Sequence, residues 1–336
     1  MAVRAVLVTP LSGALAEYGR AGAAALRVWA DRFADPGPVR LAVIDAHPDP
    51  RAAVREAEQH EPDLLFGPYG SGPMAKVAAA TELPVFNHGG ARLEPREHVV
   101  NVLAPAASYF RGALEALQRE DPGIRRVSVL HGETGFGRGV GRGAEKTAER
   151  LGLAVERVAL PVEPPDADVL LVAGRFEEEL AVARRLRRGR WAAFVGAGVD
   201  EVLAELGDRR EGLLGPAQWL PSAAPEPDEG PTAAEFVAAY RNSTGTEPPY
   251  PAAQAFASGI IAARCLHEAG VPDRSGLLAA ARRLDRTTLF GRFRLDPASG
   301  RQVGHRVLTV QWQDGERVVV WPPEQARATL RRPRAR

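Results

Sequence analysis

Short, almost wholly apolar runs alternate with longer amphipathic segments through the first hundred residues. The apolar runs lie at residues 3–8, 40–45, 63–66 and 83–86 and predict strands that are buried on both faces. The segments between them, which end near residues 33, 60 and 81, have the apolar spacing of helices. This alternation predicts a doubly wound parallel sheet with right-handed crossovers.

The same alternation returns after residue 104. Strands are expected at residues 126–130, 153–159, 169–172 and 191–195, with helices at 107–118, 139–151, 177–188 and 200–206. Three further helices, at 232–240, 252–269 and 274–284, most simply complete the first sheet. A chain of 336 residues is also too long for one ordinary core, so we expect an α/β protein with two lobes.

The end of the chain has the alternating pattern of antiparallel strands. Residues 307–312 and 317–321 flank Asp314-Gly315, a strong turn signal, and predict a terminal hairpin. We expect lobe I to hold residues 1–103 and 222–295, and lobe II to hold 104–221 and 296–326. Residues 327–336 include five arginines without apolar periodicity, which predicts a flexible tail.

Two glycine-rich turns mark the expected ligand site. Ser71 follows the strand at 63–66 and is the predicted N-cap of a helix over 72–81, while His88-Gly89-Gly90 follows the strand at 83–86. In an open parallel sheet, ligands bind outside the carboxyl ends of the strands. The helix N-terminus at Ser71 and free backbone N–H groups at Gly89, Gly90 and Ala91 therefore predict an anion site.

Composition narrows the class of partner and the compartment. The 43 basic and 42 acidic residues leave a net charge of +1, so we expect no nucleic-acid partner. Cys265 is the only cysteine, which excludes an intrachain disulfide, and no apolar run approaches the ~20 residues that span a bilayer. The first residues have no signal-peptide pattern, so we expect either a cytoplasmic chain, if Met1 is the native start, or a leader already removed.

No motif predicts a catalyst, a metal or a cofactor. Tyr69 and Pro73 occupy the places where a nucleophile elbow around Ser71 needs glycine. Residues 139–144 satisfy G-x-G-x-x-A, but they fall inside an expected helix, so close helix packing is favoured over dinucleotide binding. The seven histidines show no metal-ligand spacing.

Several stretches, in order along nearly the whole chain, resemble the type I periplasmic binding proteins, and among them the branched-chain amino-acid and amide-binding proteins of ABC importers. The matching stretches are VLVTPLSGALAEYG, LLFGPYGSGPMAKVA, LPVFNHGGA, VSVLHGETGFGRGVGRGAEKTAERLG, DVLLVAGRFEEELAVARRLR, PPYPAAQAFASGIIAA and GRQVGHRVLTVQWQDGERVVVWPP. The resemblance implies two lobes joined by a three-crossing hinge, a small-molecule ligand between them, and no enzyme activity. It also implies a monomer outside the cytoplasm that partners with ABC transporter permease subunits.

The resemblance also assigns ligand residues. The candidates are Tyr18, Tyr69, Ser71, His88, Gly89, Gly90, Ala91, Phe136, Arg175, Phe176, Gly198 and Trp219. Where the family has an acid for the ligand's ammonium group, this chain has Gly198, although Glu133 or Asp200 could substitute. The sequence therefore favours a small carboxylate or amide over a free branched-chain amino acid, and the aromatic residues among the candidates suit an aromatic ligand.

A second function remains open at this point. A cytoplasmic ligand sensor of the same fold, which controls a regulator, is the alternative to an importer's receptor.

Overall fold

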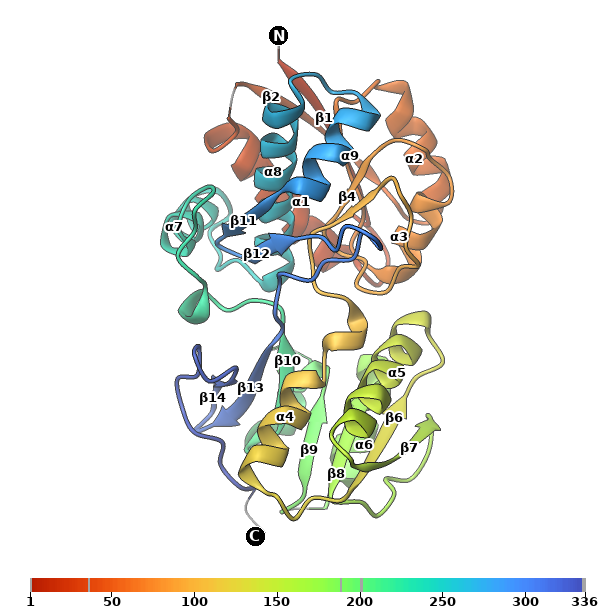
Figure 1. Cartoon of the computed structure of the whole chain (residues 1–336), viewed down its shortest axis with the longest axis vertical. Helices are drawn as coiled ribbons and strands as arrows, with labels where there is room; N and C mark the ends of the chain where they lie inside the picture. Colours follow the sequence, from red (N-terminus) through yellow and green to blue (C-terminus); the bar gives the residue numbers. More distant parts are fainter. Residues whose placement is uncertain (1, 36, 188, 200–201, 334–336) are drawn as a thin grey trace. The chain divides into compact units, whose positions relative to one another are not determined.

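Parallel strands lie at the centre of both lobes into which the chain folds. The computed structural model describes residues 2–35, 37–187, 189–199 and 202–333 (Figure 1). The first lobe consists of Met1–Pro105 and Gln218–Arg306, and the second of Ala106–Ala217 and Val307–Arg336.

The first lobe has a parallel five-stranded sheet in the order β2-β1-β3-β4-β5. Its strands are β1 (Val3–Thr9), β2 (Val39–Asp45), β3 (Leu64–Phe66), β4 (Val85–Asn87) and β5 (Val99–Asn101). The order reverses between β1 and β3, which is the switch point of a doubly wound sheet. The predicted α/β fold is confirmed for this lobe.

Helices cover both faces of this sheet and bury two apolar clusters. The helices are α1 (Ala16–Arg32), α2 (Pro50–Gln59), α3 (Ser71–Ala78), α7 (Ala233–Thr244), α8 (Tyr250–Ala269) and α9 (Arg274–Arg283). The larger cluster joins the sheet to α1 and α8, with Trp29 and Phe256 fully buried. Gly259 lets the two helices meet, because a Cβ there would lie 2.5 Å from the Trp29 ring.

The second lobe has a mixed seven-stranded sheet in the order β14-β13-β10-β9-β8-β6-β7. Its strands are β6 (Arg126–His131), β7 (Ala154–Ala159), β8 (Val169–Ala173), β9 (Trp191–Phe194), β10 (Leu214–Ala217), β13 (Leu308–Gln313) and β14 (Glu316–Trp321). The first five are parallel, and β13 joins β10 antiparallel. The predicted terminal hairpin is confirmed, with Asp314 and Gly315 at φ 55° and 82° in its turn.

Helices α4 (Arg111–Glu120), α5 (Gly135–Arg150) and α6 (Phe176–Arg185) accompany this second sheet, with short 3₁₀ turns η1 (Ala106–Ser108), η2 (Gly196–Gly198) and η3 (Ala204–Arg210). Residues 139–144 lie inside α5, as the packing interpretation predicted. A Cβ at Gly143 would lie 2.0 Å from the Ala107 carbonyl oxygen. The glycines of this motif therefore bring helix α5 against the η1 turn.

The third crossing between the lobes lies later than predicted. Residues 296–306 belong to the first lobe, not to the second, as do residues 218–221. Side chains at the crossings are the reason: Gln302 Nε2 donates to the Val102 carbonyl (3.1 Å), Gln218 Nε2 to the Ala104 carbonyl (3.3 Å), and His305 Nε2 lies 3.0 Å from the Gln218 carbonyl. These bonds tie all three crossing segments to the first lobe.

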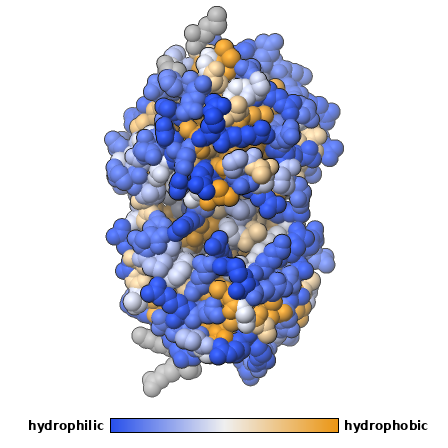
Figure 2. All heavy atoms as spheres, viewed as in Figure 1, coloured by the Kyte–Doolittle hydropathy of each residue, from blue (hydrophilic) through white to orange (hydrophobic). Residues whose placement is uncertain are grey.

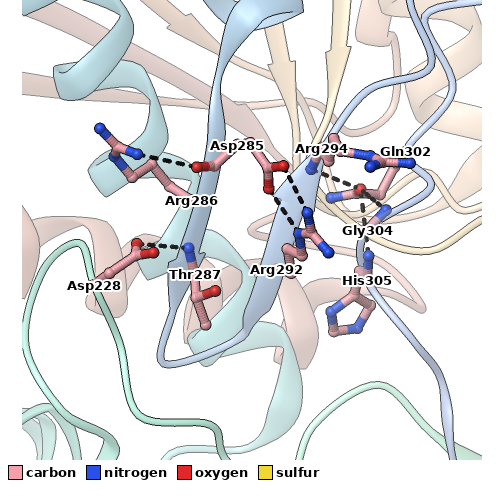
Figure 3. Close-up of polar contacts among 9 residues, drawn as sticks. All are labelled: Asp228, Asp285, Arg286, Thr287, Arg292, Arg294, Gln302, Gly304 and His305. Atoms are coloured by element: carbon pink, nitrogen blue, oxygen red, sulfur yellow. Dashed lines mark hydrogen bonds and ion pairs between the residues drawn. The ribbon is translucent and has the colours of Figure 1, made fainter.

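A short hairpin precedes that third crossing. It consists of β11 (Asp285–Thr288) and β12 (Gly291–Arg294), and the Asp285 carboxylate holds Arg292 across it at 2.6 and 2.7 Å. Figure 3 shows Gln302 beside β12, where its Oε1 accepts from the backbone of Arg294 and Gly304. The hairpin therefore fixes the glutamine that ties the crossing.

The C-terminal segment was predicted as a flexible tail, and for residues 327–333 that is wrong. Gln311 exchanges two hydrogen bonds with the backbone of Arg331, and Gln313 Nε2 donates to the Thr329 carbonyl at 2.8 Å. These two glutamines of strand β13 are buried, and they bind the backbone of the C-terminal segment. Residues 334–336 lie outside the described part.

Two remaining expectations concern a helix and the surface. The helix predicted at 200–206 is replaced by η3, and residues 200–201 lie outside the described part. Within residues 2–35, 37–187, 189–199 and 202–333, no helix has the length and apolar character needed to cross a bilayer. On the face shown in Figure 2, hydrophobic residues form small groups among hydrophilic ones.

Candidate functional site

The first lobe's candidate site lies at the carboxyl ends of β3 and β4, beside the switch point of the sheet. The backbone of Tyr69 pairs with that of Gly89 in an isolated parallel bridge, so the two turns after these strands run side by side. The Gly70 amide strengthens this contact by donating to the Gly89 carbonyl at 3.0 Å. A ligand at this edge would meet both turns at once.

Ser71 is the first residue of helix α3, not its N-cap as predicted. The N-cap is Gly70, whose φ of 100° suits glycine. The Ser71 hydroxyl instead accepts a hydrogen bond from the Arg92 backbone amide at 3.0 Å. That bond leaves the hydroxyl hydrogen available to a ligand and ties helix α3 to the turn after β4.

The prediction that Gly89 and Gly90 offer free amides is wrong. The Asn87 side-chain oxygen accepts from the Gly90 amide at 2.8 Å and from the Gly89 amide at 3.2 Å. Asn87 is fully buried, and its Nδ2 donates to the Gly90 carbonyl and to Asn101 Oδ1. Asn87 therefore shapes the turn and consumes the donors that the sequence assigned to a ligand.

Three backbone donors remain at this edge. The amides of Ser71, Gly72 and Ala91 have no hydrogen-bond partner among the described residues. The first two belong to the opening turn of α3, where amides are unpaired and the helix dipole is positive. The Ser71 hydroxyl adds a fourth donor and is bonded to the amide of Arg92, the residue after Ala91. Unpaired donors at a helix N-terminus are the kind that bind an anionic oxygen.

Tyrosines line the same edge of the first lobe. The rings of Tyr18 and Tyr69 stack at 4.8 Å with an interplanar angle of 21°. The Tyr69 hydroxyl is hydrogen-bonded to the hydroxyl of Tyr250, which opens helix α8. All three side chains are partly exposed, so an aromatic, hydroxyl-bearing wall adjoins the donor set. Tyr250 was missed, although the stretch PPYPAAQAF that holds it was among the family-like segments.

Two predicted ligand residues of this lobe face its core. His88 has no exposed surface and packs beside Gly22, and neither ring nitrogen has a partner among the described residues. Burial lowers the pKa of His88 to about 4, so the ring is neutral at pH 7. Trp219 is 4% exposed, packs on Phe236 and donates to the Leu289 carbonyl at 3.0 Å.

In the second lobe, the predicted aromatic residues lie at two helix starts. Phe136 is the second residue of α5, partly exposed, and packs edge to face on Tyr109 at 5.4 Å between centroids. Phe176 opens α6 and is 40% exposed, and Arg175 beside it is the exposed N-cap. Tyr109 was not predicted, because nothing in the sequence around it distinguishes it from a tyrosine of the core.

Gly198 cannot be replaced by an acid in this backbone. A Cβ there would lie 1.8 Å from the Pro216 carbonyl oxygen, so the position points at strand β10. Its own carbonyl accepts from the guanidinium of Arg317. Of the alternative ammonium partners, Glu133 is exposed and Asp200 lies outside the described residues. Position 198 therefore has a cation on its carbonyl and no room for an acidic side chain of its own.

Glu179 is a buried acid that the sequence reasoning missed. It has no exposed surface, and its two oxygens accept from the amides of Gly174 (3.1 Å) and Gly196 (2.7 Å). Burial raises the pKa of Glu179 to about 8, against the opposing effect of those amides. The carboxyl therefore ties the turns after β8 and β9 together from inside the lobe.

Across the part of the chain that the structure describes, no group of three His, Cys, Asp or Glu side chains is arranged to hold a metal ion.

Comparison with known proteins adds the family. A family model described as "Periplasmic binding protein" matches residues 2–175 and 186–317. The chain belongs to the periplasmic binding protein family. The type I fold expected from the sequence is confirmed for this periplasmic binding protein, because solved structures share it over nearly the whole chain. A search of curated proteins finds no match.

Three solved structures illustrate the shared fold of this periplasmic binding protein. A leucine-binding protein of Thermotoga maritima has a TM-score of 0.75 at 19% identity, over 94% of this chain and 97% of that one. A solute-binding protein of an R. palustris ABC transporter, in complex with benzoate, has a TM-score of 0.75 at 15% identity. The match covers 95% of this chain and 96% of that one. A putative branched-chain amino-acid ABC transporter protein of Silicibacter pomeroyi reaches 0.79 at 15%, over 99% of both chains.

Proposed function

We propose that this periplasmic binding protein is the solute receptor of an ABC importer and that it captures a small carboxylate without converting it. Family membership supports the receptor class, and relatives of the same fold are described as leucine-binding and as bound to benzoate. The partners we propose are permease subunits of the importer, and the compartment is the periplasm or the outer cell surface.

The observation that carries this proposal is the unpaired donor set of the first lobe. The amides of Ser71 and Gly72 lie in the first turn of helix α3, and the Ser71 hydroxyl bonds the turn that holds the Ala91 amide. A carboxylate that leaves water needs several compensating donors, and this set supplies them without a charged side chain. We expect the ligand's carboxylate to bind there.

The rest of the ligand is proposed from what surrounds the donors. The tyrosines Tyr18, Tyr69 and Tyr250 offer ring faces and hydroxyls, which suit an aromatic or other flat apolar group. A free amino acid would also bring an ammonium group, and a buried ammonium needs a carboxylate partner. Because Gly198 has no room for one, we favour an acid without an α-amino group.

Titration calorimetry tests the ligand class. The panel is benzoate, 4-hydroxybenzoate, leucine and 4-methylpentanoate, which is leucine without its amino group. We expect at least one of the three amine-free acids to bind more tightly than leucine. Micromolar leucine binding with no binding of the other three would contradict the proposed class, and chemical conversion of a bound acid would contradict a receptor role.

A substitution tests the donor set. Ser71→Ala should weaken binding of the best acid by ~1.5–3 kcal/mol, the range for hydrogen bonds to charged groups. Ser275→Ala is the matched control, because Ser275 also lies in the first turn of a helix of this lobe, where its hydroxyl donates to Asp273. Equal affinity of the Ser71→Ala and Ser275→Ala variants would refute the assignment.

A further inference from the structure

An arginine-lined pocket lies in the second lobe, at the amino ends of its parallel strands and so at the edge opposite the turns that follow β8 and β9. Arg190 immediately precedes β9, and Gly212 and Leu213 precede β10, so both mark the amino ends of parallel strands. The turn after the antiparallel strand β13 reaches the same edge, and the C-terminal segment at Pro333 packs on Gly212. The pocket between these segments measures about 690 Å³.

The charge of this pocket is strongly positive. Six arginines against three acidic residues line it within the described part of the chain, and the arginines are Arg187, Arg190, Arg209, Arg210, Arg331 and Arg332. The whole chain has a net charge of only +1, so this concentration is local. A concave, single-sign surface of this kind focuses the electrostatic field and attracts anions.

Arg190 differs from the other arginines of this pocket in the state of its side-chain nitrogens. Its Nε and Nη2 atoms are buried and have no hydrogen-bond partner among the described residues. Burial lowers the pKa of Arg190, and nearby Asp166 opposes the effect. Arg190 as a whole is only partly buried and lines the pocket, so an anion there would meet a guanidinium that keeps two nitrogens without a protein partner.

The neighbouring carboxylates are already engaged elsewhere. Glu211 accepts from the backbone amides of Asp314 and Gly315 at 3.0 and 3.4 Å. Asp168 accepts from the amides of Arg125 and Arg126, both at 2.8 Å. Asp166, whose charge acts on Arg190 as that of Asp168 does, lies 3.7 Å from Arg126. Within the described part of the chain, none of these acids forms an ion pair with Arg190.

Other arginines of the pocket are held in place. Arg210 lies over the Trp312 ring at 3.8 Å, which is a cation–π contact, and Arg209 donates to the Arg184 carbonyl at 2.8 Å. Arg331 is paired with Asp314 at 2.7 Å. Fixed guanidinium groups around an unpaired one present several forked donors, the geometry that phosphate oxygens prefer.

We propose that this pocket, which Arg190 lines, is a second binding site that takes a phosphate-bearing anion of multiple charge. The shared chemistry is the phosphate oxygen, whether it belongs to a soluble polyphosphate or to the headgroup of an anionic lipid. The site is independent of the carboxylate site on the first lobe, because its residues belong to the second lobe alone.

Titration calorimetry with tripolyphosphate at 150 mM and 500 mM NaCl tests the site. We expect saturable one-to-one binding that weakens at the higher salt concentration. Arg190→Gln should weaken binding at least about tenfold, the loss of one charge-assisted hydrogen bond. Arg119→Gln is the matched control, because this exposed arginine lies on α4 of the same lobe, and it should leave affinity unchanged.

A second variant protects the test against a folding defect. Arg187 is exposed and lines the same pocket, so Arg187→Gln should fold normally and still weaken tripolyphosphate binding. The proposal is overturned if no phosphate probe binds, or if Arg119→Gln weakens binding as much as the two pocket variants do, since the effect would then reflect total charge.

Vesicles distinguish the two sources of phosphate. Sedimentation with phosphatidylglycerol vesicles, against phosphatidylcholine vesicles as the blank, should show Arg190-dependent binding that tripolyphosphate displaces if the ligand is a lipid headgroup. Tripolyphosphate binding without vesicle binding assigns the site to a soluble anion. Vesicle binding that Arg190→Gln leaves unchanged, in the absence of tripolyphosphate binding, would overturn the site.

Discussion

The buried acid Glu179 makes the stability of the second lobe depend on pH in an unusual direction. Its pKa is raised from 4.5 to about 8 by burial in the folded protein. Between these two values the folded chain therefore holds one proton more than the unfolded chain. The contribution of Glu179 to the free energy of unfolding is therefore fully present at low pH, and it is lost as the pH rises through the pKa of the folded protein.

The magnitude follows from the same two values. Within the window, the free energy of unfolding falls by about 1.4 kcal/mol per pH unit, and the loss from pH 5 to pH 8 is on the order of 3 kcal/mol. Glu179→Gln removes this dependence, because glutamine does not titrate. Its amide nitrogen cannot accept from the Gly174 or Gly196 amide, so the variant should be less stable at pH 5 by ~1–3 kcal/mol.

Hydrogen exchange of the β8 and β9 amides, corrected for the intrinsic exchange rate at each pH, reports on this lobe. The deficit of Glu179→Gln relative to the parent protein should shrink between pH 5 and pH 8 and end in a small gain. Glu177→Gln is the control, because Glu177 is exposed in the first turn of the same helix. A deficit of Glu179→Gln that stays constant with pH would refute the reasoning.

Three further predictions concern the site and its surroundings. Asn87→Ala leaves the Gly89 and Gly90 amides unpaired and should lower the free energy of urea unfolding by ~1–3 kcal/mol. Gly198→Glu should lower the melting temperature and create no leucine binding in calorimetry, because its Cβ meets the Pro216 carbonyl. The pKa of His88 is about 4 in the folded protein, against an ordinary value of 6.5. Its contribution to the free energy of unfolding is therefore present above pH 6.5 and is lost as the pH falls. His88→Leu should therefore gain about 2 kcal/mol more, relative to the parent, at pH 5 than at pH 7 in urea unfolding. An equal effect at both values would contradict the assignment.

The fold was largely predictable because apolar runs that end in glycine-rich turns specify buried parallel strands. The pattern around residues 63–66 and 83–86 places β3 and β4 correctly. Placement of residues 296–306 failed because it depends on contacts that are distant in sequence, such as Gln302 with Val102. The tail failed for the same reason, since Gln311 on β13 binds Arg331.

The candidate site was predictable only in its location. The Ser71 turn and the turn after β4 do adjoin, but the fate of the Gly89 and Gly90 amides was decided by Asn87, two and three residues earlier. That local capping by asparagine is a known turn pattern and could have been noticed. Tyr250 could not, because its hydroxyl meets Tyr69 across 181 positions of sequence.

The packing of α1 on α8 has a consequence for the order in which the protein can fold during synthesis. Trp29 leaves the ribosome early, but its partner Gly259 follows 230 residues later (259 minus 29). At a synthesis rate of 5–20 residues per second, roughly 10–50 s pass before helix α8 is made and can pack on the apolar face of α1. The core of the first lobe therefore remains incomplete through most of translation. The apolar face of α1 stays accessible to chaperones until residue 259 has emerged.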